Sequence, residues 1–113
     1  MIDSNFNYNV DAKLETLYEE GGLLEYVVVK GEERYGDYVE LRRIFVEEDF
    51  RGKGIGTTLV KRLEKIAKNL PIYVRSSATE ESIFGKFMKK MKFNRIPQTD
   101  GVVAFEYVKN TNF

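Results

Sequence analysis

The sequence contains no cysteine and no histidine among its 113 residues. Without cysteine the chain has no disulfide, no thiolate nucleophile and no cysteine-ligated zinc. Without histidine it lacks a Ser-His-Asp triad and the side chain that binds transition metals most often. Acid–base chemistry in this protein must therefore use carboxylates, tyrosine, lysine, a chain terminus or water.

Long apolar runs, proline- or serine-rich linkers and internal repeats are also absent. No stretch approaches the roughly 18 apolar residues that a membrane-spanning helix needs, so we expect no membrane partner. Residues 1–10 are polar and lack the basic start and apolar core of a signal peptide, which predicts a cytoplasmic protein. A chain of this length with 42% hydrophobic residues is typical of a single domain, here residues 1–113.

The net charge is zero, but the two halves of the chain differ in sign. Residues 1–50 contain 13 acidic and 5 basic residues, whereas residues 51–113 contain 5 acidic and 13 basic ones. Solvated helix faces are one explanation of this split. The functional explanation is that the basic half attracts a polyanionic cofactor and the acidic half a cationic substrate. No DNA- or RNA-binding motif accompanies the basic half, so we expect no nucleic-acid partner.

β-Branched and aromatic residues predict two strands in the first half of the chain. The first strand covers Leu23–Lys30 and follows a glycine pair, and the second covers Tyr38–Val46. In the second strand Phe45 interrupts the alternation of apolar residues, which indicates either burial on both faces or a β-bulge. Residues 10–18 fit a strand or a helix, and we favour a strand that pairs back through a turn.

The second half of the chain alternates helices with short strands. Apolar spacing predicts helices over residues 57–69 and 80–91, the second capped within 76–79 and carrying two glutamates in its first turn. Short strands are predicted at 71–75, 93–96 and 102–108. The predicted order is three strands, helix, strand, helix and two strands, which indicates an α/β protein with a mixed sheet.

A glycine-rich loop, Arg51-Gly52-Lys53-Gly54-Ile55-Gly56, lies between the second strand and the first helix. Glycines let the backbone approach a ligand closely, and the unpaired N–H groups of a first helical turn favour an anion such as phosphate. Arg51 and Lys53 add positive charge. The spacing fits neither a Walker loop nor the dinucleotide-binding fingerprint, and a plain glycine-rich turn is the alternative.

From Leu41 into the first helix, the sequence resembles the GNAT superfamily of acetyl-CoA-dependent N-acetyltransferases. The family signature [RQ]-x-x-G-x-[GA], placed after an apolar strand, is matched by Arg51, Gly54 and Gly56. The predicted order of elements agrees with the family from Tyr38 to the C-terminus. The resemblance implies a GNAT-like mixed, mostly antiparallel sheet with helices packed on it, here with a reduced N-terminal helical region.

The resemblance also implies how acetyl-CoA, the acyl donor, would bind, and it implies no metal. Backbone N–H groups of the loop would hold the pyrophosphate, and the end of the preceding strand would hold the pantetheine arm. That strand and the strand at 72–75 would splay apart to admit the thioester. The implied cofactor residues are Ile44, Phe45, Val46, Arg51, Gly52, Lys53, Gly54, Ile55, Gly56 and Thr57.

Three residues are candidates for the catalytic roles that the resemblance implies. Family members often place a Glu or Tyr base on the strand before the loop, where Glu40 stands with Tyr38 as its neighbour. The alternative for Glu40 is a solvated strand carboxylate. The usual tyrosine acid of the later helix is replaced by Met88, which with Phe84 fits an ordinary core position. Tyr73, on the strand that would splay away, is then the candidate acid, with solvent as the alternative.

The function that follows is direct transfer of an acetyl group from acetyl-CoA to a primary amine of a small molecule or a protein. The acidic half of the chain favours a cationic acceptor. Relatives place two helices beside the acceptor site, and the chain has little room for them before Leu23. The acceptor site would then be open, completed by a second subunit of a homodimer, or suited to a large substrate. A non-catalytic acyl-CoA-binding module is the alternative function.

Overall fold

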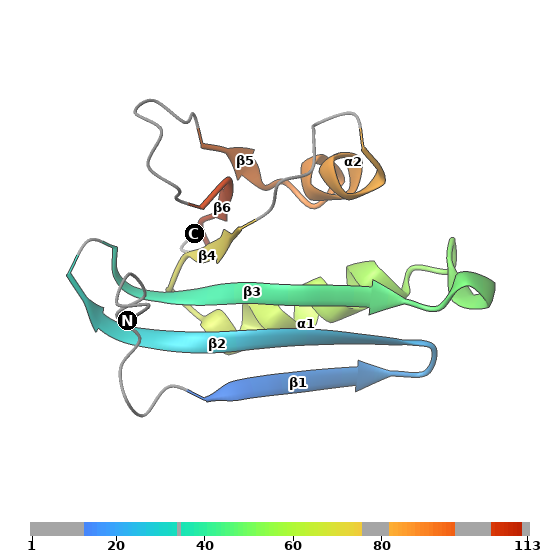
Figure 1. The fold of residues 1–113 in the computed structure, drawn as a ribbon, viewed down its shortest axis with the longest axis horizontal. Coiled ribbons are helices and arrows are strands. Elements are labelled where there is room, and N and C mark those ends of the chain that lie inside the picture. The colour runs from blue at the N-terminus through green and yellow to red at the C-terminus, as the bar shows by residue number, and fades with distance from the viewer. Residues whose placement is uncertain (1–12, 34, 76–81, 97–104, 112–113) are drawn as a thin grey trace, which may run out of the picture.

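The computed structural model describes residues 13–33, 35–75, 82–96 and 105–111. These residues form a six-stranded mixed sheet, two α-helices and a short 3-10 helix (Figure 1). Apart from the 3-10 helix, the order of elements is the one predicted from the sequence. In chain order they are β1 (Leu14–Glu19), β2 (Gly22–Glu32), β3 (Gly36–Val46), η1 (Glu48–Phe50), α1 (Ile55–Ala67), β4 (Ile72–Val74), α2 (Ile83–Lys90), β5 (Asn94–Arg95) and β6 (Tyr107–Lys109).

The strands lie in the order β1-β2-β3-β4-β6-β5. Among the described strands, β3 and β4 pair in parallel and all other neighbours are antiparallel. The long strands β1, β2 and β3 form one half of the sheet, and the short strands β4, β6 and β5 form the other (Figure 1). This confirms the mixed, mostly antiparallel sheet that the resemblance implied.

A tight turn at Gly21 joins β1 to β2. Gly21 has a φ of +86°, and its carbonyl accepts a hydrogen bond of 2.8 Å from the N–H of Glu47. A Cβ at this position would lie 2.3 Å from the ring of Phe50, so both the dihedral angle and the contact require glycine. The strand predicted for residues 10–18 is confirmed within β1, and its first residues lie outside the described part of the chain.

A β-bulge in β3 keeps the apolar residues of this strand on one face. Arg42 is the extra residue in the register between β3 and β2. It shifts the alternation of side chains by one, so that Leu41 and Ile44 both pack into the cluster beneath the helices. Of the two alternatives that the sequence left open, the bulge is therefore correct, and Phe45 remains 40% exposed.

The helices begin and end close to the predicted residues. Helix α1 buries Leu59, Val60, Leu63 and Ala67 against the sheet. Helix α2 is capped by Ser82, whose Oγ accepts a hydrogen bond of 3.0 Å from the N–H of Gly85. The predicted cap within 76–79 is therefore wrong, and the described first turn of α2 holds no glutamate. No helix in the described ranges is long and apolar enough to cross a membrane.

The strands of the second half are shorter than predicted. β4 occupies the centre of the predicted 71–75, and β5 keeps two residues of the predicted 93–96. β6 overlaps the end of the predicted 102–108 and extends one residue further, while residues 102–104 lie outside the described part. The parallel pairing of β4 with β3 joins this half to the long strands.

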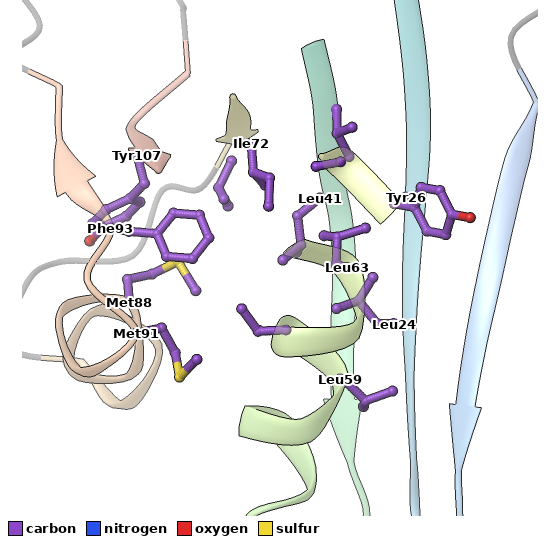
Figure 2. Packing of buried hydrophobic residues seen from close by; sticks show 14 residues of the cluster. Leu24, Tyr26, Leu41, Leu59, Leu63, Ile72, Met88, Met91, Phe93 and Tyr107 are labelled. Carbon is purple, nitrogen blue, oxygen red and sulfur yellow. The ribbon is translucent and has the colours of Figure 1, made fainter. Parts of the chain in front are cut away.

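The main core lies between the sheet and the two helices (Figure 2). Leu59 and Leu63 of α1 and Met88 of α2 are completely buried there. A second, smaller cluster is formed by side chains that alternate with these along the strands and therefore point to the opposite face. Its buried members are Val27, Val29, Tyr38 and Phe105.

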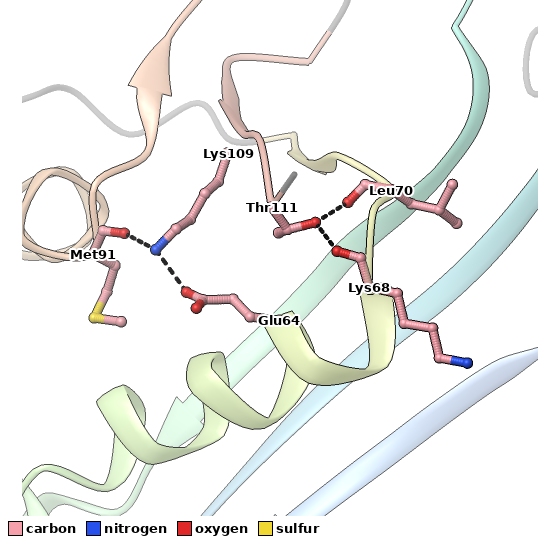
Figure 3. Close-up of polar contacts among 6 residues, drawn as sticks. All are labelled: Glu64, Lys68, Leu70, Met91, Lys109 and Thr111. Carbon is pink, nitrogen blue, oxygen red and sulfur yellow. Dashed lines mark hydrogen bonds and ion pairs between the residues drawn. The ribbon is translucent and has the colours of Figure 1, made fainter. Parts of the chain in front are cut away.

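Polar contacts fasten the end of α1 to β6 and the residues after it (Figure 3). The Nζ of Lys109 donates to Glu64 Oε2 and to the carbonyl of Met91, both at 2.6 Å. The hydroxyl of Thr111 lies 2.5 and 2.6 Å from two carbonyl oxygens beyond the helix, those of Lys68 and Leu70. Because these contacts join α1 to the half of the sheet that carries α2, they fix the two helices relative to each other.

Replacing Leu63 by alanine should lower the free energy of unfolding by roughly 2–5 kcal/mol, because the fully buried side chain would leave a cavity between α1 and the sheet. Lys61→Ala, on the exposed side of the same helix, should change it by no more than about 0.5 kcal/mol. Urea denaturation followed by circular dichroism measures both variants. Equal losses for the two would contradict the packing described here.

Candidate functional site

The glycine-rich loop leads into α1 through two residues in the left-handed region. Gly52 and Gly54 have φ values of +80° and +83°, and no atom lies within 4 Å of the Cβ that either would carry as alanine. Gly54 is the N-cap of α1 and offers no side chain to its first turn. The first hydrogen bond of the helix runs from the N–H of Thr58 to the carbonyl of Gly54. The N–H groups before Thr58 therefore face an open space at the positive end of the helix dipole.

A pocket of about 560 Å³ opens beside this loop, between the end of β3, the start of α1 and helix α2. Nine of the ten residues predicted to hold a cofactor line it, and Lys53 is the exception. The Nζ of Lys53 lies instead 5.6 Å from the ring centroid of Phe50. The remaining lining residues were not among the predicted ones, and they are Phe50, Ile83, Phe84, Phe87 and Lys90.

Gly56 is a glycine because α2 packs closely on the first turn of α1. A Cβ at Gly56 would lie 3.2 Å from Cζ of Phe87. This contact places the aromatic side of α2 over the start of α1 and forms the wall of the pocket opposite β3. Phe84 also packs against the core, as predicted, but its side chain reaches the pocket as well.

β3 and β4 separate at the pocket. Their parallel pairing covers three residue pairs and ends at Leu41 and Val74, although β3 continues to Val46. Figure 1 shows β4 turning away from β3 at this end. The separation of the two strands that the resemblance implied is therefore present.

The separated end of β3 directs backbone groups away from β2. The N–H of Glu47 donates to the carbonyl of Gly21, on the β2 side of the strand. Because backbone groups in an antiparallel ladder alternate in direction, the N–H and C=O groups of Ile44 and Val46 point to the other side, where β4 no longer pairs with β3. The Nε of Arg51 donates to the carbonyl of Val46 at 3.0 Å. This hydrogen bond closes the segment between β3 and the glycine-rich loop.

The three candidate catalytic residues lie together on the sheet face opposite the helices. Tyr38 and Glu40 are two residues apart on β3, and Glu40 pairs in register with Tyr73 of β4. The Tyr38 and Tyr73 rings meet edge to face with centroids 5.4 Å apart. The Glu40–Tyr73 pair is the one directly before the last paired residues, so these side chains lie where the strands begin to separate.

Glu40 is not the solvated carboxylate that the alternative interpretation required, because it is 2% exposed. Its Oε2 lies 3.7 Å from Nε of Arg42 and 3.9 Å from Nε of Arg75. The Arg75 guanidinium also lies over the ring of Phe105, 4.5 Å from the centroid. Two guanidinium groups thus accompany the buried carboxylate, at distances where Coulomb attraction is favourable.

Tyr73 belongs to an aromatic cluster with Tyr35, Tyr38 and Phe105, whose ring centroids lie 5.0–5.4 Å from that of Tyr73. Burial raises the pKa of the Tyr73 hydroxyl above its ordinary value of 10.0, and the neighbouring Tyr35 adds to the rise. At neutral pH the hydroxyl is therefore protonated and can donate a proton or a hydrogen bond.

Helix α2 presents no tyrosine at the position where the resemblance would place an acid. Met88 is completely buried in the core, as the sequence analysis predicted. In the described part of the chain, no group of three or more Asp, Glu, His or Cys side chains could hold a metal ion.

A model of the acetyltransferase (GNAT) family matches residues 6–82. This match covers more than half of the chain, and the protein therefore belongs to the GNAT family of acetyltransferases. A search of curated proteins finds no significant match.

Solved structures of low sequence identity share the fold. The anti-CRISPR protein AcrVA5 is 22% identical with a TM-score of 0.61, over 84% of this chain and 95% of its own. A GNAT-family protein from Desulfovibrio desulfuricans is 11% identical with a TM-score of 0.62, over 84% of this chain and 65% of its own. AtaTR bound with acetyl-CoA is 21% identical with a TM-score of 0.58, over 80% of this chain and 57% of the other. This chain thus spans nearly all of AcrVA5 but little more than half of the AtaTR chain.

The raised pKa of Tyr73 predicts a loss of stability in alkali. Because the folded protein disfavours the phenolate, the stabilisation from the neutral form is complete below pH 10 and is lost as the pH rises through the raised pKa. In Tyr73→Phe, the free energy of unfolding should decrease less steeply with pH above pH 10. A pH titration followed by the ultraviolet absorbance of tyrosinate should show one group fewer above pH 10 in the variant. Unchanged titration curves in the variant would contradict the assignment.

Proposed function

We propose that this protein is an N-acetyltransferase that binds acetyl-CoA in the pocket beside the glycine-rich loop and transfers the acetyl group directly to a primary amine. The observation that carries the proposal is the pocket itself. It combines an open helix N-terminus, a glycine-rich loop and the separated end of β3. Membership of the GNAT family supports the same chemistry.

The residues of the pocket fit the donor in shape and charge. The space above Gly52 and Gly54 would be filled by a Cβ, and the first turn of α1 directs N–H groups into it, as a pyrophosphate requires. Lys90, from α2, adds a cation to the lining. Along β3, the backbone groups of Ile44 and Val46 would pair with the amides of the pantetheine arm. The aromatic side chains of α2 would exclude water from that arm.

When bound, acetyl-CoA supplies an acetyl group activated as a thioester. The protein's part is to deprotonate the amine, and Glu40 is the proposed base because its carboxyl group is buried where β3 and β4 separate. Tyr73 is the proposed donor of the proton that the departing thiolate takes up, since its hydroxyl is protonated at neutral pH. Tyr38, 4% exposed, is the alternative base and packs against Tyr73.

A non-catalytic acyl-CoA-binding module is the second candidate function. Two observations favour it: α2 offers the buried Met88 in place of a tyrosine, and Glu40 is covered by Arg42 and Arg75. Such a module would bind acetyl-CoA in the same pocket without releasing free CoA in the presence of any amine.

Gly54→Ala should weaken acetyl-CoA binding about tenfold or more, because its methyl group would enter the space proposed for the pyrophosphate. Calorimetric titration with acetyl-CoA, with free CoA and ATP for comparison, measures the change. Gly36→Ala is the matched control, since Gly36 has a similar φ of +74° and an equally open Cβ position but does not line the pocket. If both variants bind like the unchanged protein, the pocket does not hold the pyrophosphate.

Glu40→Gln should lower kcat by roughly 10²- to 10⁴-fold, the usual contribution of a general base, while acetyl-CoA affinity stays unchanged. Release of CoA thiol in the presence of a primary amine measures turnover, and thermal melting verifies that the variant is folded. Glu25→Gln is the control because Glu25 is another sheet carboxylate beside an arginine, 3.9 Å from Arg43. Full activity of Glu40→Gln would transfer the role of base to Tyr38.

A further inference from the structure

The carboxylate proposed as the base is covered by arginine. The side chain of Glu40 is 3% exposed, whereas those of Arg42 and Arg75 are 44% and 29% exposed. Both guanidinium groups approach the same oxygen, Oε2, within 4 Å. A molecule that approaches Glu40 from solvent therefore meets guanidinium groups before it meets the carboxylate.

The position of Arg75 is defined by the residues beneath it. Its guanidinium lies over the ring of Phe105, which is 2% exposed and packs with Tyr73. A guanidinium stacked on a buried ring loses little further freedom when it binds an anion. The planar group also presents N–H donors in the geometry that carboxylates and phosphates accept.

From this arrangement we propose that the acceptor is a primary amine that also carries an anionic group, a carboxylate or a phosphate, a few bonds from its nitrogen. This inference rests on the proposed function and names the substrate class of the same site. The anionic group binds Arg75 and Arg42, and the ammonium group lies toward Glu40. A polyamine would place a second cation against the two guanidinium groups, which is unfavourable at this distance.

The anionic group also has a role in the proton transfer. When it binds the arginines, it takes up N–H donors that otherwise lie against Oε2 of Glu40, so the carboxylate can turn toward the ammonium group. Glu40 takes a proton from this group, the amine nitrogen forms a bond to the acetyl carbon, and the carbon–sulfur bond breaks. The sulfur receives a proton from Tyr73 or water, and the second proton that the nitrogen loses on becoming an amide restores that donor. An amine without the anionic group leaves Glu40 paired with both arginines and reacts more slowly.

The test compares amines that differ only in the anionic group. Ethanolamine phosphate is paired with ethanolamine, and β-alanine with β-alaninamide, while spermidine represents cationic acceptors. Release of CoA thiol from acetyl-CoA gives kcat/KM for each. We expect both anionic amines to exceed their partners by about tenfold or more, the factor that one charge-assisted hydrogen bond supplies.

Variants at the arginines connect this preference to the proposed contacts. Arg75→Gln should reduce the preference for the anionic amine over its uncharged partner about tenfold, mainly through a higher KM for the anionic amine. Arg75→Lys keeps the charge beside Glu40 and should retain part of the preference for the anionic amine. This second variant keeps the test possible if Arg75→Gln does not fold. Arg43→Gln is the control, because Arg43 lies on the same strand but pairs with Glu25.

The outcomes separate this inference from the proposed function. Failure to bind acetyl-CoA overturns the proposed function and, with it, the inference. Binding with turnover that favours spermidine, or that is equal within each matched pair, overturns the inference alone. If acetyl-CoA binds and no amine reacts, the two amines are titrated into the CoA-loaded protein. Tighter binding of ethanolamine phosphate than of ethanolamine, lost in Arg75→Gln, supports the anionic site. Equal binding of the two overturns it.

Discussion

Parallel pairing between β3 and β4 joins the two halves of the sheet over three residue pairs and ends at Leu41 and Val74. Beyond that point β3 still pairs with β2, but its other edge faces no strand in the described part of the chain, and the pocket lies beside it. The bulge at Arg42 keeps Ile44 on the same face as Leu41. A longer pairing would close the end of β3, so the site depends on two strands that are neighbours for only part of their length.

Much of the fold and of the loop could be predicted because the signals are local. Gly54 must tolerate a positive φ before a helix, and this requirement is visible in the spacing of the loop. The contribution of α2 could not be predicted, because the approach of Phe87 to Gly56 depends on how distant segments pack. The helix cap was misplaced because several residues before Ser82 are also of types that cap helices, and residue type alone does not choose between them.

The proposed charge of the acceptor is another case in which whole-chain composition and local geometry lead to different expectations. The acidic first half of the sequence suggested a cationic acceptor, yet Arg42 belongs to that half and lies directly beside Glu40. Arg75 comes from the other half and reaches the same oxygen only because β4 pairs with β3. A buried site is governed by the few charges within several ångströms, since more distant ones are screened by solvent and salt.

The turn at Gly21 has a consequence for how this molecule could be altered. Hairpin turns at a surface usually accept insertions and substitutions, because little packs against them. Here the carbonyl of the turn holds Glu47, and its missing side chain makes room for Phe50, a residue of the pocket wall. A tag or extra loop placed in this hairpin would thus disturb ligand binding from the rear of the site.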